Sequence, residues 1–402
     1  MAKLLWGRVY YGDIFAGLIR EEPGERVVFT YDASYIESGH PAVAHSLPVR
    51  AESHICGNGL HPFFDNLVSE GWLERAQSLL LGRREASRFE LLLAFGFDCA
   101  GAVSIVDLEP SDLSGAMLDM SDPMESAVLK GRASLSGVQP KFAVIKEGGA
   151  FRPARFNELS THIAKFPSPD HSDLVQNEYL TTMAFKTLMP DDEIVRLGFE
   201  EINGLDEPAL LVERFDRNAD GRLHFEEFTQ LLGRPSRAKY DGAHRDMASF
   251  MLETRGCLPT QAHLLYRRIL TGLLLGNTDM HLKNFAMFHS KSGLRLTPSY
   301  DQVSAAIYDY KTLALAIAGS ENHPIGGLKG RHLVFLGEEF GLSPAAINMA
   351  VEGLAGNTEA AKDKINEMSP GSRHLKDNLI KLMEKRWNGT FSLIGKALSR
   401  KR

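Results

Sequence analysis

The chain has 402 residues, of which 44% are hydrophobic, and its formal net charge is −6. This length and composition allow a large buried core and predict two or three domains. The negative charge argues against direct nucleic-acid binding by the surface as a whole. The exception is a basic end, either a solvated terminal helix or a phosphate-contacting patch, formed by Lys381, Lys385, Arg386, Lys396, Arg400, Lys401 and Arg402. Cys56, Cys99 and Cys257 are widely spaced and form no CxxC pair, which excludes a disulfide framework and a cysteine metal site.

No apolar run reaches the ~20 residues of a membrane-spanning helix. The start of the chain, Leu4–Ile19, alternates and is interrupted by charged residues, which is unlike a signal peptide. A cytoplasmic protein without membrane contact is therefore predicted.

The first 108 residues are predicted to mix strands and helices, from alternating and helical spacing of their apolar residues. The predicted strands are Leu4–Tyr11, Phe15–Arg20, Arg26–Tyr31 and Gly101–Asp107, and the predicted helices lie around Pro62–Glu70, Trp72–Leu81 and Ala86–Phe95. The polar stretch Glu109–Gly131 is predicted to be a linker.

Small residues then precede an apolar run. Ser134–Lys141 reads SLSGVQPK and leads into Phe142–Ile145. Backbone N–H groups in such a turn can form a concave anion site for phosphates. Because one glycine is a weak signal, an ordinary turn remains the alternative.

Three segments after this turn have the order of nucleotide-binding elements in kinases. Thr161–Phe166 alternates like a strand and carries Lys165, either a cation for ATP phosphates or a solvated edge residue. Asn177 opens a helix that runs to about Leu188. Ala209–Asp216 is an apolar strand with a polar end, as in a hinge where adenine meets backbone groups.

Asp216–Glu227 also matches the spacing of an EF-hand calcium loop. Its flanks argue against calcium, since Pro208–Phe215 is rich in strand formers where an EF-hand needs a helix. Asn218–Gly221 is typical of a tight turn between strands.

From Glu226 onward the pattern is mainly helical. The predicted helices are His244–Glu253, Gln261–Leu275, Arg331–Glu339, Pro344–Leu354 and Leu375–Leu398. Between the second and third lie the loop Gly276–Asn284, which reads GNTDMHLKN, and the expected strands Asn284–Phe288 and Leu294–Thr297.

The residues that are expected to act in catalysis lie in this loop and at Asp301. Asp279 and Asn284 stand at the spacing of a kinase catalytic loop, and Asp301 follows the hairpin as a kinase metal-binding aspartate does. Phosphoryl transfer needs a carboxylate that orients the hydroxyl, and amide and carboxylate oxygens for Mg²⁺. The pattern predicts a phosphotransferase, and a polar loop that caps a buried helix is the alternative.

Together these motifs resemble the HipA family of serine/threonine kinase toxins. The matching pieces, in chain order, are SLSGVQPKF, HIAKFP, NEY, LLVERFDR, FEEFTQLLG, GNTDMHLKNFAM and LTPSYD, with FFDNLVSEG and FELLLAFGFDCAGAVSI nearer the N-terminus. The resemblance implies an α+β, bilobal protein-kinase-like fold. Residues 1–108 would form an extra N-terminal α/β subdomain, 109–216 a mixed α/β N-lobe with phosphate loop and hinge, and 217–402 a mainly helical C-lobe.

The resemblance also implies roles for single residues. Asp279 would be the catalytic base, with His281 and Lys283 near the phosphates, and Asn284 and Asp301 would hold Mg²⁺. The ATP-binding residues would be Gly137, Val138 and Gln139 of the phosphate loop, Lys165 at the phosphates, the backbone of Glu213 and Phe215 at adenine, and Asp216 at the ribose. Ser134 stands at the family's autophosphorylation position, and a second serine, Ser136, leaves open whether Ser134, Ser136 or both take the phosphate.

The implied function is an ATP- and Mg²⁺-dependent protein kinase, the toxin of a toxin–antitoxin pair, limited by autophosphorylation. It would phosphorylate an aminoacyl-tRNA synthetase of the glutamyl or tryptophanyl type and so inhibit translation and growth. A small helix-turn-helix antitoxin, similar to HipB, would bind it and carry it to operator DNA. A small-molecule kinase or nucleotide-binding regulator on the same fold is the alternative.

Overall fold

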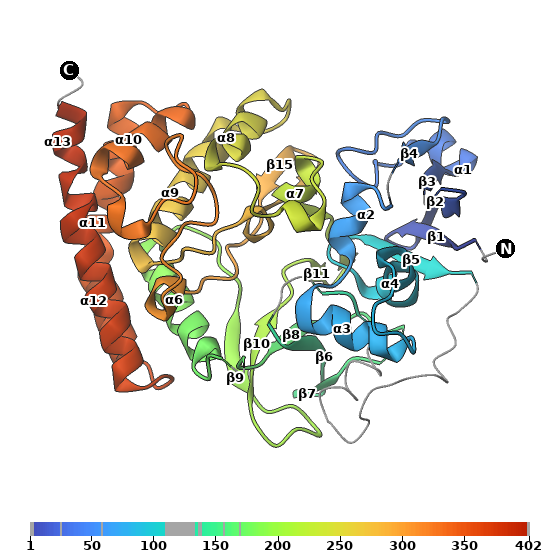
Figure 1. Cartoon of the computed structure of the whole chain (residues 1–402), viewed down its shortest axis with the longest axis horizontal. Coiled ribbons are helices and arrows are strands. Elements are labelled where there is room, and N and C mark those ends of the chain that lie inside the picture. The colour runs from blue at the N-terminus through green and yellow to red at the C-terminus, as the bar shows by residue number, and fades with distance from the viewer. Residues whose placement is uncertain are drawn as a thin grey trace. The chain divides into compact units, whose positions relative to one another are not determined.

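The computed structural model describes residues 4–24, 26–57, 59–108, 133–135, 139–155, 157–168 and 170–399. The chain forms two compact units, each made of two separate stretches of sequence. The first combines Met1–Ser168 with Arg196–Arg237, and the second combines Pro169–Val195 with Ala238–Arg402. The course of the chain can be followed by colour in Figure 1. The predicted linker Glu109–Gly131 lies outside the described residues.

A five-stranded antiparallel sheet begins the first unit, in the order β4-β3-β2-β1-β5. Its strands are β1 Trp6–Tyr11, β2 Ile14–Glu22, β3 Arg26–Tyr31, β4 His54–Cys56 and β5 Val103–Asp107. Gly12, with a φ of 57°, makes the tight turn between β1 and β2. Alternation buries Val9, Ile19 and Phe29 on one face. The four strands predicted here are confirmed, and short β4 is an addition.

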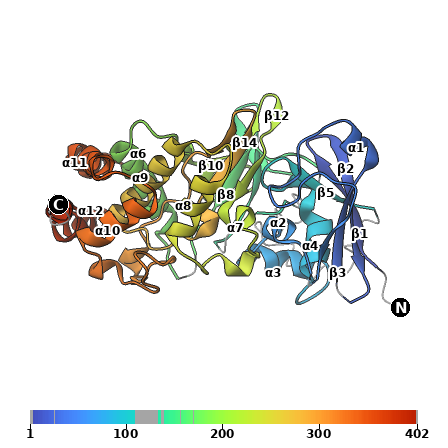
Figure 2. The ribbon, with the colours of Figure 1, turned by 90° about the horizontal axis from the view of Figure 1, so that it is seen from above.

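Helices cover one face of this sheet. They are α1 Ala33–Glu37, α2 Pro62–Leu67, α3 Gly71–Leu80 and α4 Arg88–Phe95. Figure 2 shows α2, α3 and α4 on the same side of the strands. Ser87 and Glu90 form a capping box that fixes the start of α4. The three predicted helices are confirmed, with ends shifted by a few residues.

The second sheet of this unit holds the predicted nucleotide-binding strands, in the order β7-β6-β8-β10-β9. Its strands are β6 Lys141–Glu147, β7 Ala150–Pro153, β8 His162–Lys165, β9 Leu197–Glu200 and β10 Ala209–Glu213. In the antiparallel register Lys165 faces Lys141 on one side and Leu210 on the other. The unit ends with the hairpin β11 Arg217–Asn218 and β12 Gly221–Arg222, then β13 Phe225–Glu227 and α7 Phe228–Leu231.

The second unit is mainly helical, and the helices predicted after Glu226 lie in it. Its helices are α6 Leu174–Leu188, α8 His244–Glu253, α9 Pro259–Leu275, α10 Gly330–Glu339, α11 Pro344–Glu367, α12 Arg373–Gly389 and α13 Ile394–Ser399. The hairpin β14 Ala286–Ser290 and β15 Gly293–Leu296 follows α9. Leu265, Ile269, Leu270, Leu273 and Leu274 of α9 are completely buried and form the centre of the unit. Figures 1 and 2 both show α11 lying along α6.

Two predicted helices have different ends. The helix expected at Pro344–Leu354 continues to Glu367, because Thr358, Ala361 and Ile365 extend its buried stripe. The helix expected over Leu375–Leu398 ends at Gly389. Thr390 leaves the helical conformation and donates its hydroxyl to the carbonyl of Leu328 at 2.9 Å, so the rest forms a short turn and α13. Among the described helices, none combines the length and apolarity needed to cross a membrane.

Candidate active site

The second unit carries the predicted catalytic loop directly after α9. Gly276 ends the helix in the left-handed conformation, with a φ of 80°. A Cβ here would lie 2.3 Å from Cδ2 of Leu382 and 2.9 Å from the hydroxyl oxygen of Ser304. Both backbone conformation and space therefore require glycine. The reversal leads the chain into the loop formed by residues 277–284.

Hydrogen bonds within the loop hold its polar residues in place. The N–H of Asp279 donates to Oδ1 of Asn277 at 3.1 Å, and the N–H of His281 donates to Oδ1 of Asn284 at 3.0 Å. The N–H of Lys283 donates to Nδ1 of His281 at 3.3 Å, which makes that ring nitrogen an acceptor. His281 and Lys283 are buried, so their side chains are fixed as well. Such a loop presents preorganised polar groups to a reacting molecule.

Asn284 and Asp301 lie side by side, although they are far apart in the sequence. Nδ2 of Asn284 donates to Oδ2 of Asp301 at 3.0 Å. Asp301 has a φ of 70°, a conformation that few residues other than glycine adopt and that aspartate tolerates better than most. The hydroxyl of Tyr300 donates to the carbonyl of Lys283 at 2.9 Å and ties this segment to the loop. The result is an amide and a carboxylate that can offer oxygen ligands together.

The Asp279 carboxyl has a perturbed proton affinity. It is accessible to solvent, but neighbouring protein atoms desolvate it in part. This desolvation, and then the negative charge of Asp301, raise the pKa of Asp279 to about 6, while a hydrogen bond from Tyr240 and the charge of Lys239 lower it. A carboxyl group whose pKa lies near neutrality is suited to accept a proton from a reacting hydroxyl.

Sequence reasoning missed Lys239 and Tyr240. They lie in a turn between the short helix Ser236–Ala238 and α8. The N–H of Leu282, within the catalytic loop, donates to the carbonyl of Lys239 at 3.1 Å. No motif or periodicity marks these residues, and only the folded chain brings them to the loop.

In the first unit, Lys165 occupies the last position of β8 and is 8% exposed. Its register partner Lys141, at the start of β6, is 7% exposed. Side chains directly opposite on antiparallel strands lie about 5 Å apart at Cβ, so like charges there repel. The register thus places two buried cationic side chains on one face of the sheet. Lys141 was not among the predicted site residues.

The predicted phosphate loop lies partly outside the described residues, which exclude Ser136, Gly137 and Val138. Gln139 is described, and its Nε2 donates to the carbonyl of Phe166 at 2.8 Å. Ser134 is 3% exposed, and its hydroxyl donates to the carbonyl of Leu67 at 2.5 Å.

The predicted hinge residues lie at the end of β10 and just after it. The N–H of Glu213 donates to the carbonyl of Arg196 at 2.8 Å, so of its backbone groups the carbonyl is the better candidate for a contact with adenine. The ring of Phe215 packs against that of Phe225, with 5.0 Å between centroids.

Asp216, the predicted ribose contact, lies among buried partners of the first unit. Its side chain is buried, forms ion pairs with Arg214 and Arg217 at 2.8 and 2.7 Å, and accepts a hydrogen bond from the N–H of Gly101. Although burial acts against ionisation, the two guanidinium groups hold the pKa of Asp216 well below its usual range. These partners fix the position of the Asp216 side chain within the first unit.

The EF-hand alternative does not fit the same region. Strand β10 stands where an entering helix would be needed, and Asn218 accepts the N–H of Asp220 in a tight turn.

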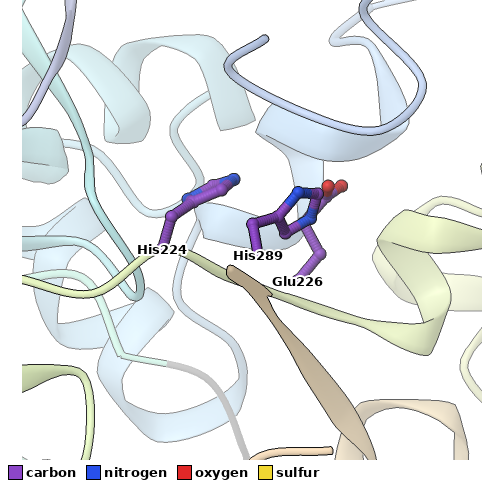
Figure 3. A group of neighbouring side chains, drawn as sticks. All are labelled: His224, Glu226 and His289. Carbon is purple, nitrogen blue, oxygen red and sulfur yellow. The ribbon is translucent and has the colours of Figure 1, made fainter. Parts of the chain in front are cut away.

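Figure 3 shows His224 and Glu226 on the chain that leads into α7. The N–H of Ala102 donates to Nδ1 of His224 at 3.4 Å, and the N–H of His45 donates to Glu226 at 2.6 Å. His289, the third side chain in that figure, belongs to β14 of the second unit.

Comparisons with known proteins agree on one family. Residues 133–362 match the HipA-like C-terminal domain, and residues 7–106 match the HipA N-terminal domain. The chain is 30% identical to the serine/threonine-protein kinase toxin HipA of Shewanella oneidensis over 354 residues, 79% of each protein. It is also 30% identical to the putative kinase Y4dM of Sinorhizobium fredii over 322 residues, 74% of this chain and 76% of that protein.

Solved structures give the same answer. The fold is similar to HipA in a complex of HipA, HipB and operator DNA from Shewanella oneidensis MR-1, with a TM-score of 0.72, 25% identity and coverage of 97% of this chain and 99% of that one. The proinflammatory kinase CtkA of Helicobacter pylori has the same kind of fold, with a TM-score of 0.50, 12% identity and coverage of 68% and 95%. These matches confirm the predicted α+β, protein-kinase-like fold. The chain therefore belongs to the HipA family of serine/threonine-protein kinase toxins.

Proposed function

We propose that this chain transfers the γ-phosphoryl group of ATP to serine or threonine hydroxyls of a protein. The observation that supports this most is the contact of Asn284 with Asp301 at 3.0 Å, beside a loop that presents Asp279. In this proposal Asp279 orients the acceptor hydroxyl and takes its proton as the oxygen attacks phosphorus. Within the first unit, Lys165 and Lys141 are proposed to bind the phosphates of ATP, and the backbone of Glu213 and Phe215 to bind its adenine.

Magnesium fits the donors at the second unit. The Asp301 carboxylate and the Asn284 amide supply the hard oxygen ligands that Mg²⁺ prefers, and these two residues would hold it together with phosphate oxygens. When bound, the ion neutralises part of the phosphate charge. His281 and Lys283, fixed beside these ligands, are proposed to keep the loop in the geometry that binding requires.

The further assignments concern partners and regulation. We propose a small helix-turn-helix antitoxin of the HipB kind as partner, because a similar solved complex contains HipA, HipB and operator DNA. Operator DNA would then be reached through the antitoxin. An aminoacyl-tRNA synthetase of the glutamyl or tryptophanyl type is the proposed substrate, and its phosphorylation would inhibit translation and growth. Autophosphorylation at Ser134, Ser136 or both is proposed to limit the activity.

The decisive test is Asp279→Asn with γ-labelled ATP and Mg²⁺, using the purified protein alone and with cell lysate. Asparagine keeps the shape of the side chain but cannot accept the proton, so the rate of transfer should fall by about 10²-fold or more. ATP affinity and the melting temperature should stay close to those of the unchanged protein.

Asp363→Asn is the matched control, because Asp363 is exposed on α11 of the same unit. It should transfer phosphate at the normal rate. Normal turnover by Asp279→Asn would remove the proposed role of the loop. Labelled proteins in the lysate would support a protein kinase, whereas label only on small molecules would favour the alternative of a small-molecule kinase.

A further inference from the structure

The turn formed by Lys239 and Tyr240 is anchored to the catalytic loop at several points. Besides the bond from the N–H of Leu282 to the carbonyl of Lys239, the ring of Tyr240 lies edge-on to that of His281, with 5.1 Å between centroids. Nζ of Lys239 lies 5.4 Å from the centroid of the Tyr240 ring. The Tyr240 ring is therefore held by a cation–π contact and by an aromatic edge contact.

Tyr240 also reaches the proposed base, since its hydroxyl forms a hydrogen bond with the carboxylate of Asp279. The side chain is nevertheless 46% exposed. A tyrosine needed only for core packing would be buried, so packing alone does not explain this position. A hydroxyl that holds one carboxylate oxygen leaves the other free to accept the proton of a substrate hydroxyl.

Lys239, in contrast to the half-exposed Tyr240, is only 7% exposed. Lysine is rarely buried unless a negative group lies close by. The ammonium group of Lys239 lies over the ring of Tyr240, and its charge also favours the ionised form of Asp279. The buried lysine therefore helps to hold the ring that carries the hydroxyl.

We propose that the Lys239–Tyr240 turn is part of the catalytic centre, with Tyr240 positioning the Asp279 carboxylate and the ammonium group of Lys239 holding the Tyr240 ring in place. This rests on the proposed kinase function. In the reaction, the acceptor oxygen forms a bond to the γ-phosphorus, the bond from phosphorus to ADP breaks, and the hydroxyl proton goes to the free oxygen of Asp279. Tyr240 keeps its own proton and acts only on the orientation of the base.

Tyr240→Phe tests the positioning role, because phenylalanine keeps the ring contacts with Lys239 and His281 and removes only the hydroxyl. We expect kcat for transfer from γ-labelled ATP to lysate proteins to fall at least about tenfold, since a hydrogen bond to a charged group is lost. The KM for ATP and the melting temperature should not change. Tyr310→Phe, at a tyrosine that is 60% exposed in the same unit, is the control and should leave kcat unchanged.

Lys239 is tested with a pair of variants. Lys239→Met keeps most of the side-chain length and removes the charge, so kcat should fall, whereas Lys239→Arg should restore much of it. Normal kcat in Tyr240→Phe would overturn the proposal, as would a parallel loss of kcat, ATP affinity and melting temperature, which indicates a structural role. If the unchanged protein transfers no more label than Asp279→Asn does, the kinase function itself fails and this proposal fails with it.

Discussion

At the scale of single residues, the backbone of Asp301 shows how the fold fixes a charged group. A left-handed conformation costs a residue other than glycine about 1–3 kcal/mol and persists only where surrounding contacts impose it. Here those contacts come from Asn284, which donates to the Asp301 carboxylate, and from Tyr300, which donates to the carbonyl of Lys283. These contacts offset the conformational cost and keep the Asp301 carboxylate beside the Asn284 amide, which is the arrangement proposed to bind Mg²⁺.

Asp301→Asn should therefore abolish the effect of Mg²⁺ on ATP binding. Asparagine also tolerates a positive φ and keeps an acceptor for Asn284, but it removes the negative charge that attracts the ion. Calorimetric titration with ATP, once with Mg²⁺ and once with EDTA, should show magnesium-enhanced affinity in the unchanged protein only.

Asp309→Asn is the matched control for this substitution. Asp309 also has a positive φ, of 68°, but its side chain is 86% exposed and is paired with Lys311. This variant should bind ATP with the normal dependence on magnesium. An equal enhancement by magnesium in Asp301→Asn would contradict the proposed ligand set.

The sequence predicts the acidic residues of the candidate site but not Lys239 and Tyr240, which lie beside them in the folded chain. Asp279, Asn284 and Asp301 stand at spacings that phosphoryl transfer imposes on a loop and a hairpin, so local pattern was enough to select them. Lys239 and Tyr240 lie in a polar turn with no periodicity, and contact the loop only after the second unit has folded. Asp216 is the opposite case. A family motif marks this residue, but the motif does not predict its buried ion pairs with Arg214 and Arg217.

At the scale of elements, apolar spacing predicts that the long helices exist, but it does not predict the residues at which they end. The buried face of α11 continues through Thr358 and Ala361. Because one of these side chains is polar and the other is small, the hydrophobic pattern of the sequence does not reveal the continuation. At Thr390 a single long-range hydrogen bond to Leu328 ends α12, although the spacing continues toward Leu398. Helix existence follows from local sequence, but these ends depend on tertiary contacts.

The first residue of α8 predicts a pH dependence of stability. His244 is completely enclosed, and this burial lowers its pKa to about 4, although Asp246 acts in the opposite direction. The unfolded chain has the ordinary value of about 6.5 and so binds the proton more readily below that pH. The contribution of His244 to stability is thus fully present above about pH 6.5 and is lost as pH falls toward 4. At pH 5 the loss should be about 2 kcal/mol.

His244→Gln should make the melting temperature depend less on pH between 6.5 and 4.5, whatever its effect on absolute stability. His374→Gln is the control, since His374 is exposed on α12 and its ring bonds to Asn378 of the same helix. That variant should keep the full slope. Melting curves at half-unit pH steps would decide the matter, and an unchanged slope in His244→Gln would show that another group causes the dependence.

At the scale of the whole molecule, the first unit ties together residues that are distant in sequence. The segment 133–135 is held against α3 and the turn between α2 and α3 by four buried hydrogen bonds, one of them between the hydroxyls of Ser69 and Ser134. Besides the bond from Ser134 to Leu67, the N–H of Leu135 donates to the hydroxyl of Ser69, and Gln77 donates to the carbonyl of Ala133. Because the residues on the two sides belong to different motifs, sequence alone did not connect the proposed phosphorylation site with the N-terminal helices.

These contacts make autophosphorylation a change of structure as well as of charge. A phosphate on Ser134 carries about −1.5 to −2 charges and cannot donate to the carbonyl of Leu67, so the segment must leave its buried position. Lys141 and Lys165 are cations of the same unit that could then hold the phosphate, in competition with ATP. We therefore expect that modified protein loses ATP binding and transfer activity. Intact-mass analysis after incubation with ATP and Mg²⁺, followed by assay of the separated modified fraction, measures both effects.

Serine variants show which residue is the switch. If Ser134→Ala alone prevents modification, Ser134 is the site and its buried hydrogen bond is what phosphorylation breaks. If only the double change of Ser134 and Ser136 to alanine prevents it, both serines take phosphate and control is shared. Asp279→Asn should remain unmodified when incubated alone, which shows that the reaction is the protein's own. A modified fraction that binds ATP and labels lysate proteins at the normal rate would contradict self-limitation, because a released and charged segment would then leave the site unaffected.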